Sequence, residues 1–318
     1  MTHPLFIIGR KIGFFLAVLA GVSFAIIAIS RMVPGDAIDQ ISDSPEQRAE
    51  LERQLGLNLQ VHEQYIHWWG KALAFDLGES WVIRQGEPVS NLVAPAAEKT
   101  VSLVLPALLL NFGIAILLIS FFRYDGFSGL KGIVRAAAHA TSVIPLFLLG
   151  YLIILALNVP TNALIEQGSM SRPEWFALPG EETWHKYFLC VIVLAIGNGT
   201  LSDVLLQLES EVQQLSQQEF MISARARGAR YWSHFLPNVL IPAVTIFVNK
   251  AGFMIGGVVV VEYVFTINGL GMMIWNAANQ RDIPVIVAIS FLISAVVSSL
   301  HLLNDLLQVL VDPRVRRG

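Results

Sequence analysis

The sequence predicts an all-α membrane protein, a polytopic helix bundle with about six spanning helices. Two observations support this fold class. Hydrophobic residues make up 54% of the 318 residues and charged residues only 14%, whereas a soluble domain carries about 25% charged residues. The chain also contains several long stretches without any charge. This composition excludes an ordinary soluble enzyme, a disordered chain and a basic nucleic-acid-binding protein.

Six stretches are candidate spans, because charge is costly in hydrocarbon and about 20 apolar residues cross a bilayer as a helix. The fourth is short for a span, and the fifth is interrupted only by Lys250. The first could instead be a cleaved signal peptide, although it is long for one. The stretches are residues 12–30, 100–122, 136–165, 187–202, 231–261 and 283–304.

The distribution of Lys and Arg orients the bundle, since basic residues favour the cytoplasmic side. With six spans, the N-terminus, the second–third loop, the fourth–fifth loop and the C-terminal tail lie on one side, and all four are basic. We therefore expect both termini in the cytoplasm of a bacterial cell, with the chain in its inner membrane. The organisation follows as a first span (1–30), a large periplasmic loop (31–99) and a core (100–318).

The large outer loop shows helical signals. Ser44 and Pro45 form a typical helix start and Gly56 a typical stop. A second helix would place Val61, Tyr65, Trp68 and Trp69 on one face. We expect that face to pack on the outer ends of the spans; the alternative is that it lies on the membrane interface.

Catalytic signatures are missing from the sequence. There is no phosphate-binding loop, so we expect no nucleotide hydrolysis and no bound cofactor on this chain. Residues 62–67 resemble a zinc-protease motif, but the second histidine comes one residue too late to share the helix face. The sequence therefore predicts neither catalytic residues nor a metal site.

The cytoplasmic segment 216–230 predicts a short docking helix. Ser216 and Glu219 have the spacing of a capping box, and Gly228 is a natural stop. Ala224 and Gly228 would form a bare face that another protein can approach closely. Phe220 and Met221 would supply apolar knobs, and Arg225 and Arg227 a polar rim. The alternative is a solvated loop helix.

The segment 219–228 resembles the coupling helix of ABC importer permeases of the dipeptide, oligopeptide and nickel branch. Weaker matches to that branch follow one another in the same order along the chain. One departure is Ile222-Ser223-Ala224, where the family usually has Glu-Ala-Ala. The matching segments are residues 32–36, 54–58, 62–65, 76–80, 88–89, 261–265, 269–271, 281–284, 304–305 and 312–316.

The resemblance implies a type I ABC importer permease that pairs with a second permease, most simply a homologue. Two ATPase subunits would bind ATP and Mg²⁺ below it, and a periplasmic or lipid-anchored binding protein would deliver substrate, with peptides as the leading class. ATP-driven closure of the ATPases would act through the helix Glu219, Phe220, Met221, Ala224, Arg225, Arg227 and Gly228. The alternatives from other classes are an ion-coupled secondary transporter and a non-transporting membrane scaffold or sensor.

Polar residues inside the fifth span are candidates for the translocation path or gate. Lys250 should face protein or water, and we expect an ion pair with an acidic neighbour such as Glu262, the alternative being a path-lining role. Gly252 and Gly256 allow close helix crossing, at a permease seam or a gate. We expect Glu262 to be a boundary carboxylate in water, the alternative being a contact at the mouth of the path.

Overall fold

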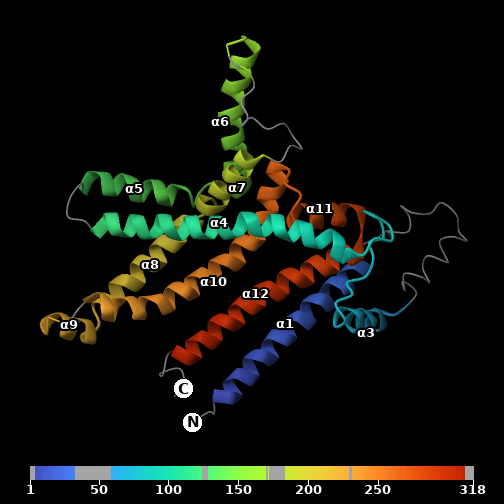
Figure 1. The fold of residues 1–318 in the computed structure, drawn as a ribbon, viewed down its shortest axis with the longest axis horizontal. Coiled ribbons are helices and arrows are strands. Elements are labelled where there is room, and N and C mark those ends of the chain that lie inside the picture. Colours follow the sequence, from blue (N-terminus) through green and yellow to red (C-terminus); the bar gives the residue numbers. More distant parts are fainter. Residues whose placement is uncertain are drawn as a thin grey trace, which may run out of the picture. The chain divides into compact units, whose positions relative to one another are not determined.

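The computed structural model describes residues 4–32, 59–123, 128–169, 171, 183–228 and 231–311. Regular structure in these ranges is helical, apart from an isolated bridge between Glu79 and Pro88 (Figure 1). The chain divides into two compact units. Unit 1 comprises residues 1–100 and 268–318, and unit 2 comprises residues 101–267.

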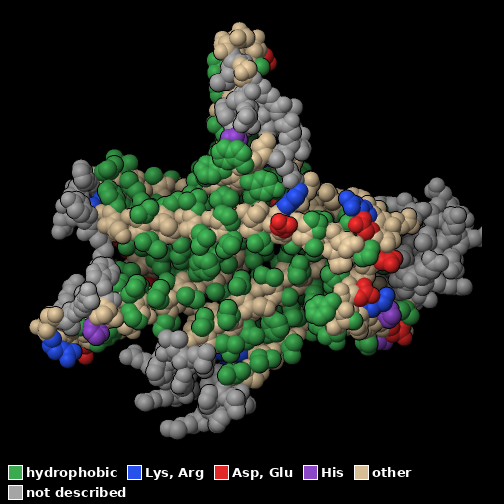
Figure 2. All heavy atoms as spheres, viewed as in Figure 1, with side chains coloured by type: hydrophobic (Ala, Val, Ile, Leu, Met, Phe, Trp, Pro, Cys, Tyr) green, Lys and Arg blue, Asp and Glu red, His purple; other side chains and the backbone are tan. Residues whose placement is uncertain are grey.

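The predicted spans agree with five helices that are long and apolar enough to cross a membrane, and a sixth if one bent helix pair is counted as a span. In Figure 2, hydrophobic side chains cover much of these helices, whereas charged side chains gather at loops and helix ends. The five are Ile8–Ile29, Val89–Phe122, Leu146–Glu166, Ser233–Phe265 and Ile283–Gln308. The bent pair is Trp184–Ile196 with Thr200–Ser216.

Unit 1 is built on two long helices, α1 (Pro4–Met32) and α12 (Ile283–Val311), which pack against each other (Figure 1). An ion pair joins Lys11 Nζ to Asp305 Oδ2 at 2.5 Å. The first part of α4 (Val89–Arg123) packs with α11 (Leu270–Gln280) and the start of α12. The buried core of this contact consists of Val89, Leu92, Val93, Ala96, Leu270, Ala277, Val285, Ala288 and Ile289.

The aromatic face of α3 (Val61–Ala72) packs on the spans, as the first of the two sequence interpretations predicts. The Tyr65 hydroxyl donates to the Ala20 carbonyl at 2.9 Å, and Trp69 Nε1 donates to Ser23 Oγ at 3.2 Å. Trp68 and Trp69 meet Phe291 edge-on, with ring centroids 5.2 and 5.6 Å away. The other helix expected in the outer loop, from Ser44 to Gly56, falls outside the described residues.

Asp282 ties the segment that precedes α4 to the start of α12. Its carboxylate is fully buried and accepts four hydrogen bonds. The donors are Ser80 Oγ at 2.5 Å and the backbone N–H groups of Trp81, Val82 and Ile83 at 3.0–3.1 Å. The turn thus brings three amides and a hydroxyl to one anion, which offsets the cost of burying it.

Unit 2 contains the rest of α4 with α5 (Ser128–Ala140), α6 (Leu146–Glu166), α7 (Trp184–Ile196), α8 (Thr200–Ser216), α9 (Glu219–Ala226) and α10 (Tyr231–Phe265). Helix α10 is the central element, because α6, α7, α8 and α9 all contact it. A buried hydrophobic core of unit 2 lies where α4, α5 and α8 meet α10. It consists of Ala115, Ile119, Ala138, Leu201, Val204, Leu205, Leu208 and Ile246.

The third and fourth predicted spans are not continuous helices. The stretch 136–165 is divided between α5 and α6 by a break at residues 141–145. The stretch 187–202 is divided between α7 and α8, which meet at 48°. Pro145 accounts for the first break, because a proline disfavours helical backbone in the residue before it. Gly197 and Gly199 account for the second, and Gly199 has φ +73°.

Replacing Asp282 by Ala removes the acceptor for three buried amides, so we expect the stability to fall by about 3–5 kcal/mol. Thermal unfolding of the detergent-solubilised protein measures the change. Glu87→Ala is the matched control, since its ion pair with Arg84 is largely exposed and should contribute less than about 1 kcal/mol. Equal effects of the two substitutions would contradict the anchoring role of Asp282.

Candidate functional site

The two helix breaks of unit 2 lie side by side and define the candidate site. A Cβ atom on Gly199 would lie 3.1 Å from Ser142 Cβ, and one on Gly197 would lie 2.6 Å from Leu146 Cδ1. Glycine is therefore needed at both positions for the α7–α8 break to approach the α5–α6 break. Asn198, between the two glycines, also has a positive φ of 52°.

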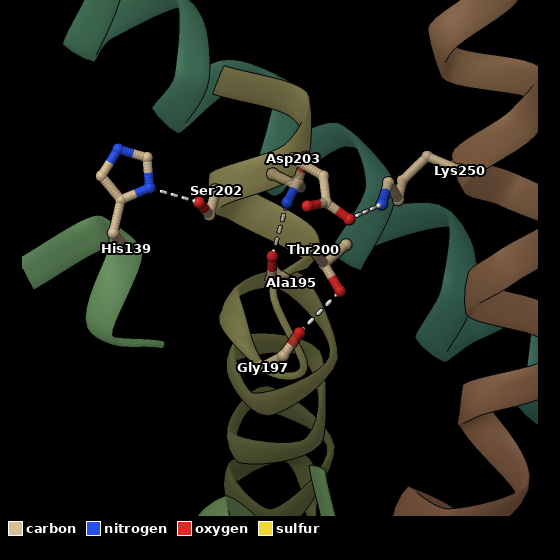
Figure 3. A network of polar contacts seen from close by, with 8 residues as sticks. His139, Ala195, Gly197, Thr200, Ser202, Asp203 and Lys250 are labelled. Carbon is tan, nitrogen blue, oxygen red and sulfur yellow. Dashed lines mark hydrogen bonds and ion pairs between the residues drawn. The ribbon is translucent and has the colours of Figure 1, made fainter. Parts of the chain in front are cut away.

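Two polar side chains bond backbone carbonyls at the α7–α8 break, and a third contact joins two side chains of α5 and α8 beside it (Figure 3). Asn111 Nδ2 on α4 donates to the Ala195 carbonyl at 2.6 Å, and Thr200 Oγ1 donates to the Gly197 carbonyl at 2.6 Å. Nδ1 of His139 on α5 lies 2.6 Å from Ser202 Oγ. In a membrane such partners are required, because an unsatisfied backbone group costs several kcal/mol there.

The same network contains an ion pair between Lys250 on α10 and Asp203 in the first turn of α8 (Figure 3). Lys250 Nζ lies 3.0 Å from Asp203 Oδ2 and 4.7 Å from the centroid of the Phe253 ring. The two partners differ in exposure: the Lys250 side chain is 8% exposed and that of Asp203 50%. The Lys250 ammonium is thus buried, and the Asp203 carboxylate lies between it and the exposed side of α8.

The expectation that Lys250 pairs with an acidic neighbour is confirmed, but the partner is Asp203 and not the suggested Glu262. Glu262 stands twelve residues further along α10, which corresponds to a rise of about 18 Å. The second prediction for Glu262, a boundary carboxylate in water, is wrong, since its side chain is fully buried. Helices α6 and α7 cover this end of α10, where Lys186 Nζ donates to Thr266 Oγ1 at 3.0 Å.

Gly256, one of the two glycines expected to permit close helix crossing, meets no neighbour among the described residues, whereas the glycine next to it does. A Cβ atom on Gly256 would meet no heavy atom within 4 Å in the described part of the chain. The adjacent Gly257 does receive a neighbour, because its Cβ would lie 3.4 Å from Leu146 Cδ2 on α6. A seam at Gly252 and Gly256 with a second permease therefore stays a prediction.

Helix α9 forms where the docking helix is expected, but it presents a different face. Met221 is fully buried and Ala224 is 4% exposed, and Met221 packs with Leu215 and Phe235 of its own chain. The predictions that Met221 is an exposed apolar knob and that Ala224 lies on the open bare face are therefore wrong, whereas Gly228 is exposed. The large apolar residues that α9 exposes are Phe220 and Ile222.

The ends of α9 also differ in part from the expectation. Ser216 is the last residue of α8, and its hydroxyl donates to the Gln213 carbonyl, so it does not cap α9. Gly228 does follow α9 with φ +68°, as a helix stop requires. Glu219 and Arg227 are exposed, whereas the side chain of Arg225 lies outside the described set.

Two important residues of the site were missed in the sequence. Asp203 and Asn111 look unremarkable there, because one ends a charge-free stretch and the other is a single amide inside an apolar one. The available signal was the dipeptide Asn198-Gly199, which is typical of a turn and not of a helix interior. A break there predicts a need for capping side chains and therefore directs attention to polar residues in the neighbouring spans.

Comparison with known proteins gives one family and several relatives. The family model described as "Binding-protein-dependent transport system inner membrane component" matches residues 116–317. A putative peptide permease protein of Brucella ovis is 29% identical over 312 residues, covering 95% of this chain and 96% of that protein. The oligopeptide transport system permease protein AppB of Bacillus subtilis is 28% identical, with coverages of 94% and 96%. The glutathione transport system permease protein GsiC of Salmonella typhi is 28% identical, covering 98% of both chains.

The close approach of the two breaks can be tested with Gly197→Ala. The added Cβ would lie 2.6 Å from both Leu146 Cδ1 and the Val193 carbonyl oxygen, so we expect a loss of about 1–3 kcal/mol in stability. Gly256→Ala adds the same methyl group where nothing lies within 4 Å and should be neutral or stabilising by up to about 1 kcal/mol. Thermal unfolding in detergent compares the two, and an equal loss would argue against the packing of the breaks.

The different exposures of Lys250 and Asp203 predict unequal effects of removing either charge. Asp203→Asn leaves a buried ammonium without its counter-charge and should cost about 3–5 kcal/mol. Lys250→Met leaves a half-exposed carboxylate and should cost only about 1 kcal/mol. The double variant should be more stable than Asp203→Asn alone. The unfolding free energies of the three variants give the coupling energy between Lys250 and Asp203. Strictly additive effects of the two substitutions would contradict a coupled pair.

Proposed function

The chain belongs to the family of binding-protein-dependent transport system inner membrane components and is a transmembrane permease subunit of an ATP-driven importer, for which we propose peptides as the substrate class. The family works with other importer subunits. We propose for this chain one homologous permease, two ATPase subunits that bind ATP and Mg²⁺, and a binding protein on the outer side. Both chain termini then lie in the cytoplasm.

The observation that carries the proposal is the architecture of α9. Phe220 and Ile222 expose apolar side chains on a helix of eight residues between two spans. Met221, on the other face, packs with Leu215 of α8 and Phe235 of α10. A subunit that binds the exposed face of α9 would therefore move α8 and α10 together with α9. This is the property that a docking helix needs to couple ATPase closure to alternating access.

The substrate class is inferred from the relatives. Two of those described above are named for peptides or oligopeptides, and the third is named for glutathione, itself a small peptide. Identity below 30% does not carry a single substrate from one of these proteins to this chain. It does support a passage for short, polar, peptide-like molecules.

An ion-coupled secondary transporter is the weaker alternative, although the structure contains two features expected of one. These features are helices broken inside the membrane and the charge pair of Lys250 with Asp203. Membership in the importer family favours ATP as the energy source. Uptake that persists after ATP depletion and stops when the proton gradient collapses would reverse this conclusion.

Association with ATPase subunits is the direct test of the proposed function. The chain is co-expressed with the permease and ATPase genes that neighbour its own and purified in detergent through a tag on this chain. We expect ATPase subunits to co-purify and to hydrolyse ATP. A folded chain that associates with no ATPase would contradict the proposal.

The exposed face of α9 is tested by Ile222→Asp. The added charge lies on the proposed interface, so we expect the amount of co-purified ATPase to fall by at least about tenfold, as a loss of 1.4 kcal/mol would produce, while the unfolding temperature stays the same. Met221→Asp is the comparison, because it places a charge among Leu215 and Phe235 and should lower stability first. Unchanged ATPase association in a folded Ile222→Asp variant would place the interface elsewhere.

A further inference from the structure

Helix α8 has two faces of opposite character. The buried face carries Leu201, Val204, Leu205, Leu208 and Leu215. A second face carries Asp203, Gln207, Ser210 and Gln214, spaced at i, i+4, i+7 and i+11, which places them on one side of the helix. The last three residues are exposed, and half of the Asp203 side chain is exposed. We call these four residues the polar stripe.

The end of the polar stripe at Asp203, where α8 begins, lies well inside the spanning region. Asp203 is paired with Lys250, which stands close to the middle of the 35 residues of α10. It also lies within one helical turn of the break that Asn111, near the middle of α4, helps to cap. A carboxylate at this depth cannot face lipid without a large penalty. Its exposed side must therefore meet either water or another protein.

The geometry of the ion pair leaves the negative charge of Asp203 exposed at this end of the stripe. Lys250 approaches from the buried side and bonds Oδ2. The other oxygen, Oδ1, accepts no hydrogen bond from any residue that the structure describes, and it lies near the break, 3.8 Å from where a Cβ on Gly199 would be. An anion with a buried counter-charge and a free oxygen is suited to receive a cation from the open side.

We propose that the polar stripe of α8 is a wall of the translocation path and that Asp203 is its cation-selecting residue. It would act on the ammonium and guanidinium groups of passing peptides. The inference rests on the proposed function as an importer and adds the substrate chemistry: positively charged or N-terminally free peptides pass more readily than anionic ones. A partner permease that covers the stripe is the competing occupant.

The test measures water access and electrical sign along α8 without knowledge of the substrate. Single cysteines are placed at Gln207 and Gln214 in the complete transporter, held in inside-out membrane vesicles. Cys190 is the only native cysteine of this chain and is fully buried, so Cys190→Ala leaves the introduced cysteine as this chain's only thiol, and labelling is read on this chain after the subunits are separated. Leu117→Cys on α4 is the lipid-facing control, because Leu117 is 70% exposed on an apolar helix.

Each cysteine is treated with a cationic and an anionic methanethiosulfonate of similar size. The rate constant for each reagent is divided by the rate constant of the same reagent with a small thiol in solution. We expect Gln207→Cys to react with both reagents and about twofold faster with the cation, because the Asp203 charge about 6 Å away is partly offset by Lys250 directly behind it. Leu117→Cys should not react. In the Asp203→Asn/Lys250→Met background, which leaves no buried charge unpaired, the ratio should fall to about one.

Three outcomes would overturn the proposal. If Gln207→Cys reacts with neither reagent while Gln214→Cys reacts with both, lipid or the partner permease covers the stripe. A rate ratio near one in the presence of Asp203 removes the role in selection. A ratio that stays high in the double variant assigns the selection to another group. None of these outcomes affects co-purification with the ATPase, so failure of this inference is distinguishable from failure of the proposed function.

Discussion

A helix that breaks inside a membrane frees backbone carbonyls and amides that water does not reach. Unit 2 contains two such breaks, and the hydrogen bonds that close them determine which residues must be present around them. Asn111 bonds the freed carbonyl of Ala195, and Thr200 bonds the Gly197 carbonyl through both its hydroxyl and its backbone N–H. Ser142 and Thr141, at the other break, donate to the His139 and Ala138 carbonyls. These polar residues inside an apolar bundle thus follow from the breaks.

The breaks also explain how a small helix at one end of unit 2 could influence its interior. Helix α8 begins at the capped break and ends next to α9, and α9 is fixed to it by the packing of Met221 and Leu215. Asp203, in the first turn of α8, is bonded to Lys250 of α10. Displacement of α9 therefore acts on the ion pair of Asp203 with Lys250 and on the two bends, where unit 2 has alternatives to continuous helix. A bundle of unbroken helices would offer no such place for two packings of similar energy.

The sequence predicts the apolar spans well, because the cost of charge in hydrocarbon is large and local. It predicts the broken spans poorly, since Gly197 and Gly199 need a facing element before a break between them is stable, and that element, around Ser142, lies more than 50 residues earlier in the chain. The pairing of Lys250 shows the same limit: the need for an anion is visible in the sequence, but its identity is not. For α9, the sequence places the helix, while the choice of buried face depends on Leu215 and Phe235, which approach only in the folded chain.

Two carboxylates in this protein illustrate how a structural acid differs from one available for function. Asp282 is fully buried and saturated, since a hydroxyl and three amides bond its two oxygens. A ligand could reach it only by displacing the turn that it stabilises. Asp203 has one oxygen bonded by a buried cation and the other free, and half of its side chain is exposed. Lys250 bonds only Oδ2 and from the buried side, so the exposed oxygen can exchange partners while the fold is kept. An acid of this second kind, in a spanning helix, is the kind that a passing cation can use.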